Sequence, residues 1–291
     1  MTTEIILKPQ KRISPSSINT FEHCPRKYYF SYIDKKPKAK TIHLLKGSIV
    51  HRVLEIFFGG YKKDGKKYII ELFKKEWVDN KEKLKQLELP AQELHLGKKD
   101  AYKMIINYYN KYRTNANDLI EAGKAENERH AFFLLKPQIK ELWVEDVSLH
   151  CGGFIDRIHK DFDGVVTLGD YKTGKKYGIG LPRDARRQIS IYGLLYVNQT
   201  QVVPDFVSII FLRYGEEYLL EVTPSLLKYA RNTILEVWGK TRSVDLSDYP
   251  KKEGKLCGWC DFFTICSGEK KHKKGIRQKK MKELIKNVKN K

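Results

Sequence analysis

Four cysteines divided between the two ends of the chain constrain its fold more than any other feature. Cys24 stands alone near the start of the sequence, whereas Cys257, Cys260 and Cys266 form a C-x2-C-x5-C cluster near its end. Thiolates gathered in this way hold a soft metal centre, either zinc or an iron–sulfur cluster. One ligand from one end and three from the other would make this centre a staple that joins the terminal segments of a globular core.

The composition is that of a globular protein. The chain has 291 residues, 41% of them hydrophobic, which is enough for one large core or two small ones. No stretch approaches the roughly 18 consecutive apolar residues of a membrane helix, and the N-terminus has no apolar signal core. We therefore expect a cytoplasmic or nucleoid-associated protein that is not secreted. In a reducing compartment the cysteines favour metal ligation over disulfides.

The charge predicts a polyanionic partner. The formal net charge is +21, and residues 269–291 alone carry eleven Lys or Arg residues against two Glu residues. This basic tail is either a solvated segment or an arm that contacts phosphates, whose grip would weaken steeply with salt. Because no amphipathic anchor accompanies the charge, nucleic acid is favoured over a membrane surface.

Hydrophobic periodicity predicts an α/β protein with a mixed sheet flanked by helices. The expected helices are an N-terminal one that carries Cys24, followed by 47–58, 183–196 and 225–238. The expected strands are 130–135, 143–147, 151–159, 165–171, 205–213 and 217–222. Residues 61–125 are rich in Lys, Glu, Leu and Tyr and indicate a helical insertion that forms the wall of a cleft. We find no internal repeats.

Two carboxylates and a lysine mark the centre of the chain. Asp156 and Asp170 flank a hairpin turn at Asp163-Gly164, so neighbouring strands could bring them to one Mg²⁺ or Mn²⁺ ion. Lys172 lies two residues after Asp170, and strand alternation places both on the same face. There the ammonium could orient the attacking water and offset charge that develops on a phosphate. Each residue alone is more often a surface turn or a salt bridge.

Four further polar residues are ambiguous on spacing alone. His51 lies on the 47–58 helix, where a single histidine is usually structural. Gln188 and Tyr192 lie four residues apart on the 183–196 helix and therefore share a face, as half-buried core polarity also would. Glu128 is an acid that an ordinary cap or surface role would explain.

Taken in order, these motifs resemble the RecB-like branch of the PD-(D/E)xK nuclease superfamily, in particular its members with an iron–sulfur staple. Those members are the AddB nuclease domain, the exonuclease V type and the CRISPR-adaptation nucleases. The matching motifs are ISPSS at 13–17, CPRKYY at 24–29, GSIVH at 47–51 with Leu54-Glu55, Glu128-x3-Phe132 as a strand before the first acid, GGFID at 152–156, DYKTG at 170–174, Gln188-x3-Tyr192 and the C-terminal cysteines. Two departures are mild: Ile155 stands where the superfamily name has Pro, and Asp170 where many members have Glu.

The resemblance implies a restriction-endonuclease-like core and a role for each motif residue. It makes His51, Asp156, Asp170 and the carbonyl of Tyr171 the ligands of the catalytic Mg²⁺ or Mn²⁺ ion, and Lys172 the catalytic lysine. Gln188 and Tyr192 would position the DNA strand or steady the site. Cys24, Cys257, Cys260 and Cys266 would hold a structural 4Fe–4S cluster, with zinc as the alternative. The expected organisation is one nuclease domain over 1–268, followed by the tail at 269–291.

Three functions fit this resemblance. The first is a metal-dependent DNA nuclease, an exonuclease or flap-trimming enzyme that prefers single-stranded ends and acts in repair, recombination or replication. The second is a CRISPR-adaptation nuclease that trims new spacers. The third is a DNA-binding partner of a helicase that does not cut, which the intact Asp156, Asp170 and Lys172 disfavour. The chain has no helicase phosphate loop, so any unwinding would need a partner.

Overall fold

The computed structural model describes residues 12–38, 41–176, 178–254 and 256–268. The basic tail at 269–291 lies outside the described residues, so its two interpretations stay open. The chain divides into two compact units, Met1–Pro15 with Lys40–Glu236 and Ser16–Ala39 with Val237–Lys291. We call the first the sheet unit and the second the cysteine unit, and describe each by itself.

The sheet unit is built on a mixed sheet, as predicted, with five strands in place of the six expected. Its strands lie in the order β1-β2-β3-β4-β5 and comprise β1 (Ile139–Asp146), β2 (Cys151–Lys160), β3 (Val166–Lys172), β4 (Phe206–Phe211) and β5 (Glu216–Glu221). Only β3 and β4 run parallel to each other, and the other neighbouring pairs are antiparallel. The parallel pair requires a crossover, which α8 (Arg183–Thr200) supplies.

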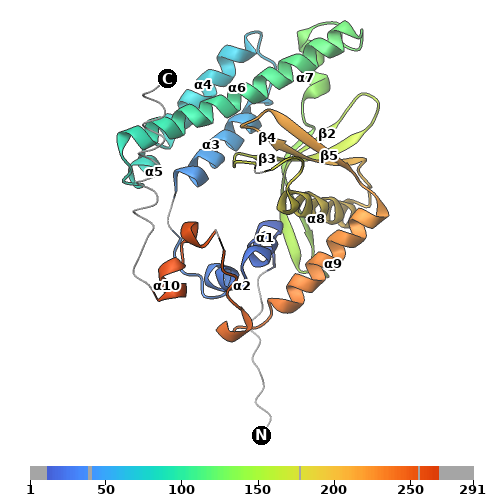
Figure 1. Cartoon of the computed structure of the whole chain (residues 1–291). Helices are drawn as coiled ribbons and strands as arrows, with labels where there is room; N and C mark the ends of the chain where they lie inside the picture. Colours follow the sequence, from blue (N-terminus) through green and yellow to red (C-terminus); the bar gives the residue numbers. More distant parts are fainter. Residues whose placement is uncertain (1–11, 39–40, 177, 255, 269–291) are drawn as a thin grey trace. The chain divides into compact units, whose positions relative to one another are not determined.

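Helices cover both faces of this sheet (Figure 1). On one face, α8 is buried along most of its length, and Gly193 lets it approach Val207 of β4 closely. On the other face lie α3 (Ile42–Phe57), α4 (Gly65–Asp79), α5 (Lys81–Lys85) and α6 (Ala91–Glu121). Side chains of α3, α4 and α6 form one core cluster with Tyr171, Ile210 and Leu212 of the sheet and its margin. The segment 61–125 is therefore helical, as expected.

The expected strand at 130–135 is wrong, because these residues form helix α7 (Glu128–Leu135). The Asn127 side chain caps the helix by accepting a hydrogen bond from the His130 N–H. Ala131 is buried against Ala116 of α6, and the neighbouring leucines pack around them. The composition of the segment, rich in Phe and Leu, suggested a strand, but the Asn127 cap and the packing against α6 stabilise a helix instead. The Glu128-x3-Phe132 motif is consequently helical too.

The cysteine unit gathers segments from both parts of the sequence. Its elements are α1 (Pro15–His23), α2 (Pro25–Tyr28), the π-helical turn Tyr29–Ile33, the C-terminal part of α9 (Pro224–Lys240), the 3₁₀ turns Leu246–Asp248 and Cys257–Trp259, and α10 (Phe263–Ser267). The single N-terminal helix that we expected is interrupted at Cys24, whose backbone is extended and precedes Pro25 at the first position of α2. Tyr28 stacks on Tyr249 with ring centroids 6.1 Å apart.

Among the described helices, none combines the length of a membrane span with sufficient apolar character.

Candidate active site

The hairpin between β2 and β3 brings the two predicted acids together. Its turn is closed by the Asp161 carboxylate, which accepts a hydrogen bond from the Val165 N–H, and Gly164 adopts a φ of 87° that favours glycine. The register pairs Arg157 of β2 with Gly169 of β3. The next residue on each strand, Asp156 on β2 and Asp170 on β3, therefore lies opposite the other. The Tyr171 N–H donates to Asp156 Oδ2 at 2.6 Å. Asp156 is thus fixed against the strand that carries Asp170.

A histidine and two carboxylates form a group with the spacing of metal ligands. His51 on α3 places Nδ1 3.3 Å from Asp156 Oδ1. The ligand atoms of His51, Asp156 and Glu141 all lie within 4.8 Å of one another, and the three side chains line one small hollow. One nitrogen and several carboxylate oxygens suit a divalent cation such as Mg²⁺ or Mn²⁺.

The second acid belongs to a hydrogen-bonded group with the lysine and the Gln-x3-Tyr pair. Gln188 Nε2 donates to Asp170 Oδ1 at 2.9 Å and to the Tyr192 hydroxyl at 3.4 Å. Lys172 Nζ donates to Gln188 Oε1 at 2.8 Å and lies 2.8 Å from Asp170 Oδ2. Gln188 therefore fixes the positions of Asp170 and Lys172 relative to each other. Tyr192 packs against Gly153 and accepts a hydrogen bond from Gln188, which fixes the Gln188 side chain in turn.

Within this group, Asp170 Oδ2 faces the Lys172 ammonium. This oxygen is buried, and its contact with Lys172 is an ion pair by distance but does not meet the angles of a hydrogen bond. Buried polar atoms rarely lack a hydrogen-bond partner, so this oxygen fits a role as a ligand to an additional cation. The residues at the site thus fit the divalent ion that the motifs imply.

Electrostatics couple the two groups. Burial alone would lower the pKa of His51, but the hydrogen bond and charge of Asp156, helped by Asp170, raise it overall. Burial raises the pKa of Asp170, against the opposing effect of Lys172, and Asp156 raises it further. Since a bound cation favours the ionised carboxylates, it would relieve the repulsion between these acids.

Glu141 is the site residue that the sequence analysis missed. It lies across from Asp156 in the β1–β2 register and has a φ of 53°, and partial burial together with the Asp156 charge raises its pKa. Two carboxylates opposite each other repel, which is unfavourable unless a cation lies between them. The expected strand began at Trp143, two residues too late to include Glu141. The acid singled out earlier in the chain, Glu128, instead pairs with Arg113 at 2.7 Å.

All four cysteines of the proposed staple fall in the cysteine unit, although more than two hundred residues separate Cys24 from the others. Each is half-buried and free of disulfides. Burial raises the pKa of the Cys266 thiol, and the nearby Cys24 and Cys260 thiols act in the same direction. The remaining cysteine, Cys151, is buried in β2 within the sheet unit, as its lack of partner spacing predicts.

The family of the chain follows from comparison with known proteins. The model of the PD-(D/E)XK nuclease superfamily matches residues 12–267. Among solved structures, a protein of Eubacterium rectale, provisionally named an exonuclease, aligns with a TM-score of 0.49 at 17% identity over 89% of this chain and 92% of that one. No curated protein sequence matches the chain. Because the family model covers most of the sequence, including every motif at the site, the chain belongs to the PD-(D/E)XK nuclease superfamily.

Proposed function

We propose that the protein is a Mg²⁺- or Mn²⁺-dependent deoxyribonuclease that hydrolyses phosphodiester bonds at DNA ends. The observation that carries this proposal is the position of Lys172, whose Nζ is held by Gln188 at 2.8 Å and lies 2.8 Å from Asp170. A non-cleaving DNA-binding protein would have no need for an ammonium held in this way beside two metal-binding acids.

The residues of the site have distinct parts in this reaction. A divalent ion bound by His51, Asp156, Asp170 and the Tyr171 carbonyl would polarise the phosphate and lower the pKa of a water molecule. Lys172 orients that water and offsets the negative charge that develops on the phosphate oxygens. Gln188 fixes Lys172 relative to Asp170, and Tyr192 fixes Gln188. Glu141 adds a further carboxylate on the open side of the site.

An exposed aromatic pair beside the acids supports a preference for single strands. Trp143 and Phe154 are cross-strand neighbours with ring centroids 4.9 Å apart, and 42% and 52% of their surfaces are exposed. They lie two positions from Glu141 and Asp156, a strand distance of about 7 Å. Trp143 is held by a hydrogen bond from Nε1 to Glu145, and its ring lies over Gly152. Unstacked bases bind such aromatic surfaces, whereas bases in a duplex are already stacked.

Cleavage assays on end-labelled single-stranded and duplex DNA test the activity. We expect cleavage with Mg²⁺ or Mn²⁺, none with a chelator, and a loss of at least about 100-fold in Lys172→Ala or Asp156→Ala. Lys160→Ala and Asp163→Ala alter exposed residues of the same hairpin and should retain activity. Cleavage by both site variants at the parental rate would refute the assignment.

The substrate preference has its own test. Trp143→Ala should weaken binding of single-stranded DNA by about 1–3 kcal/mol, the usual contribution of one stacked base, and affect duplex DNA much less. Phe162→Ala removes an exposed aromatic side chain from the β2–β3 turn and serves as the matched control. Equal losses on single-stranded and duplex DNA would contradict base stacking at Trp143.

For the cysteine unit we propose a structural 4Fe–4S cluster. The contribution of Cys24 and Cys260 to the Cys266 pKa supports a shared centre. Protein purified without oxygen should be brown and contain about four iron and four sulfide per chain, whereas colourless protein with stoichiometric zinc would overturn the proposal.

A further inference from the structure

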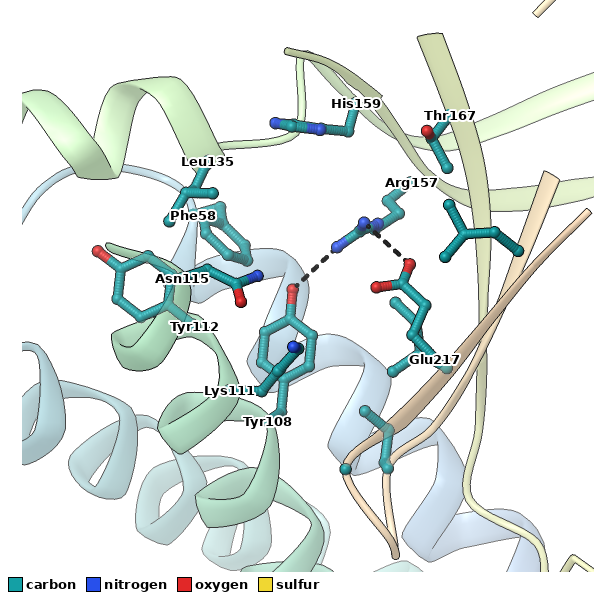
Figure 2. A pocket seen from close by; sticks show the side chains of 14 residues that line it. Phe58, Tyr108, Lys111, Tyr112, Asn115, Leu135, Arg157, His159, Thr167 and Glu217 are labelled. Atoms are coloured by element: carbon teal, nitrogen blue, oxygen red, sulfur yellow. Dashed lines mark hydrogen bonds and ion pairs between the residues drawn. The ribbon is translucent and has the colours of Figure 1, made fainter. Parts of the chain in front are cut away.

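A second pocket lies on the opposite face of the sheet from Asp170. It lies between α6 and the strands β2 to β5, and its volume is about 890 Å³ including its open mouth. Figure 2 shows the side chains that line it, with Arg157 pointing into the space between Tyr108 and Glu217. Ile210 and Leu212 mark this as the face that α3 and α6 cover, whereas Asp170 contacts α8.

Arg157 is a buried cation with weak partners. Only 15% of its side chain is exposed, and its two terminal nitrogens each lie 3.5 Å from an acceptor, the Tyr108 hydroxyl and Glu217. Its Nε has no hydrogen-bond partner. The side chain lies across Gly169, where a Cβ atom would come within 2.9 Å of Nε. A buried guanidinium normally has close, charge-assisted hydrogen bonds, whereas the ion pair of Arg157 with Glu217 is long, at 3.5 Å, which favours a second, closer acceptor.

The other residues that line the pocket indicate the chemical class of ligand that it would bind. Lys111, exposed at the pocket, adds a second positive charge, and Glu217 is the single acid among the lining residues. The lining therefore has one excess positive charge, which suits a small anion. Tyr112, which is half-buried, presents an aromatic ring beside it, and Asn115 offers an amide for hydrogen bonding (Figure 2). A small anion alone would leave the exposed part of the Tyr112 ring facing solvent.

We propose that this pocket binds a phosphate monoester that carries a planar ring, with a 5′-mononucleotide as the fitting class. The phosphate would bind Arg157 and Lys111, and the base would lie against the half-buried ring of Tyr112. Guanidinium groups bind phosphate through paired hydrogen bonds, and tyrosine and phenylalanine rings stack on nucleobases. This site is separate from the metal-binding acids, and its occupancy does not depend on cleavage.

Calorimetric titration of the full chain with thymidine 5′-monophosphate, in a chelator that removes divalent ions, tests the proposal. We expect binding at least 10-fold tighter than that of inorganic phosphate or of thymidine alone, because each probe has only half of the contacts. Equal affinity for inorganic phosphate would overturn the ring contact, and equal affinity for thymidine would overturn the role of Arg157.

Variants locate the site. Arg157→Met keeps much of the side-chain volume and should weaken mononucleotide binding at least 10-fold, while Lys172→Ala should leave it within about 2-fold. Lys111→Glu is an exposed substitution that leaves the core unchanged, and it should weaken mononucleotide binding several-fold. If Arg157→Met does not fold, Lys111→Glu alone tests whether the ligand binds in this pocket. Binding lost in Lys172→Ala but kept in the two pocket variants would place the ligand at the nuclease site. That result, or no binding at millimolar concentration, would overturn the proposal.

Discussion

The two chemical centres of this chain are organised in different ways. In the sheet unit, Asp156, Asp170 and Lys172 are held by hydrogen bonds and ion pairs from three elements of the fold. In the cysteine unit, Cys257 and Cys260 lie at one 3₁₀ turn, Cys24 directly precedes α2, Cys266 lies in α10, and the four thiols form no disulfide. The acids and the lysine of the first centre are therefore held by groups of the protein itself, whereas the proposed cluster would fix the thiols of the second.

The largest effect expected from this difference concerns Asp170. Asp170→Asn keeps the shape of the side chain and its contact with Gln188 but removes a buried negative charge. We expect activity to fall by at least about 100-fold, while the free energy of unfolding stays the same or rises, because burial destabilises the ionised carboxylate. Cleavage rates together with urea unfolding measure both effects. A large loss of stability would show that Asp170 has a structural role and would contradict the contrast between the two centres.

In the cysteine unit, by contrast, we expect a substitution to lower the stability. Cys257→Ser removes one ligand, so iron content should fall from about four atoms per chain to below about one, and limited proteolysis should cut the cysteine unit much sooner. Cys151→Ala is the control, because this buried strand cysteine lies in the sheet unit. If Cys257→Ser retains full iron and the parental protease resistance, the thiols do not depend on a shared ligand.

Much of this fold, but only part of the site, follows from local sequence signals. The alternation around Asp156 and Asp170 and the Asp163-Gly164 turn predict the hairpin correctly, because both depend on residues near in sequence. Glu141 was missed because its role arises from its register opposite Asp156, which only the assembled sheet defines. The segment around Phe132 was assigned to a strand because its composition outweighed the Asn127 cap.

Tyr108 shows the same limit of prediction from local sequence. It lies on α6, within the insertion that has no recognisable motif, and its hydroxyl is 3.0 Å from that of Tyr171. Both rings are buried, and Tyr171 is the residue whose N–H holds Asp156. Nothing near Tyr108 in the sequence indicates that the insertion helix contacts the strand between Asp170 and Lys172. The contact makes Tyr108 a positioning residue for the site.

A moderate effect follows for Tyr108→Phe, which removes one hydroxyl and leaves Tyr171 without this buried hydrogen bond. We expect a loss of about 1–3 kcal/mol in stability and a severalfold decrease in kcat with little change in KM, since the buried Tyr108 acts on the site through Tyr171. The Mg²⁺ concentration that gives half-maximal activity should rise. Tyr112→Phe, on the same helix, is the matched control. Unchanged kcat and Mg²⁺ dependence would limit Tyr108 to a structural role.

The smallest effect concerns His159, which lies in β2 and lines the second pocket. Burial lowers its pKa, against the opposing effect of a 2.8 Å hydrogen bond to the Leu134 carbonyl. The unfolded chain therefore binds this proton more readily than the folded one, so the stability contribution of neutral His159 is complete above the unfolded pKa of about 6.5 and is lost as the pH falls through the folded pKa. His159→Gln can keep the hydrogen bond to Leu134 without titrating. Its melting temperature should thus decline less than that of the parent between pH 7.5 and pH 5, and parallel declines would show that His159 is accessible to protons in the folded state.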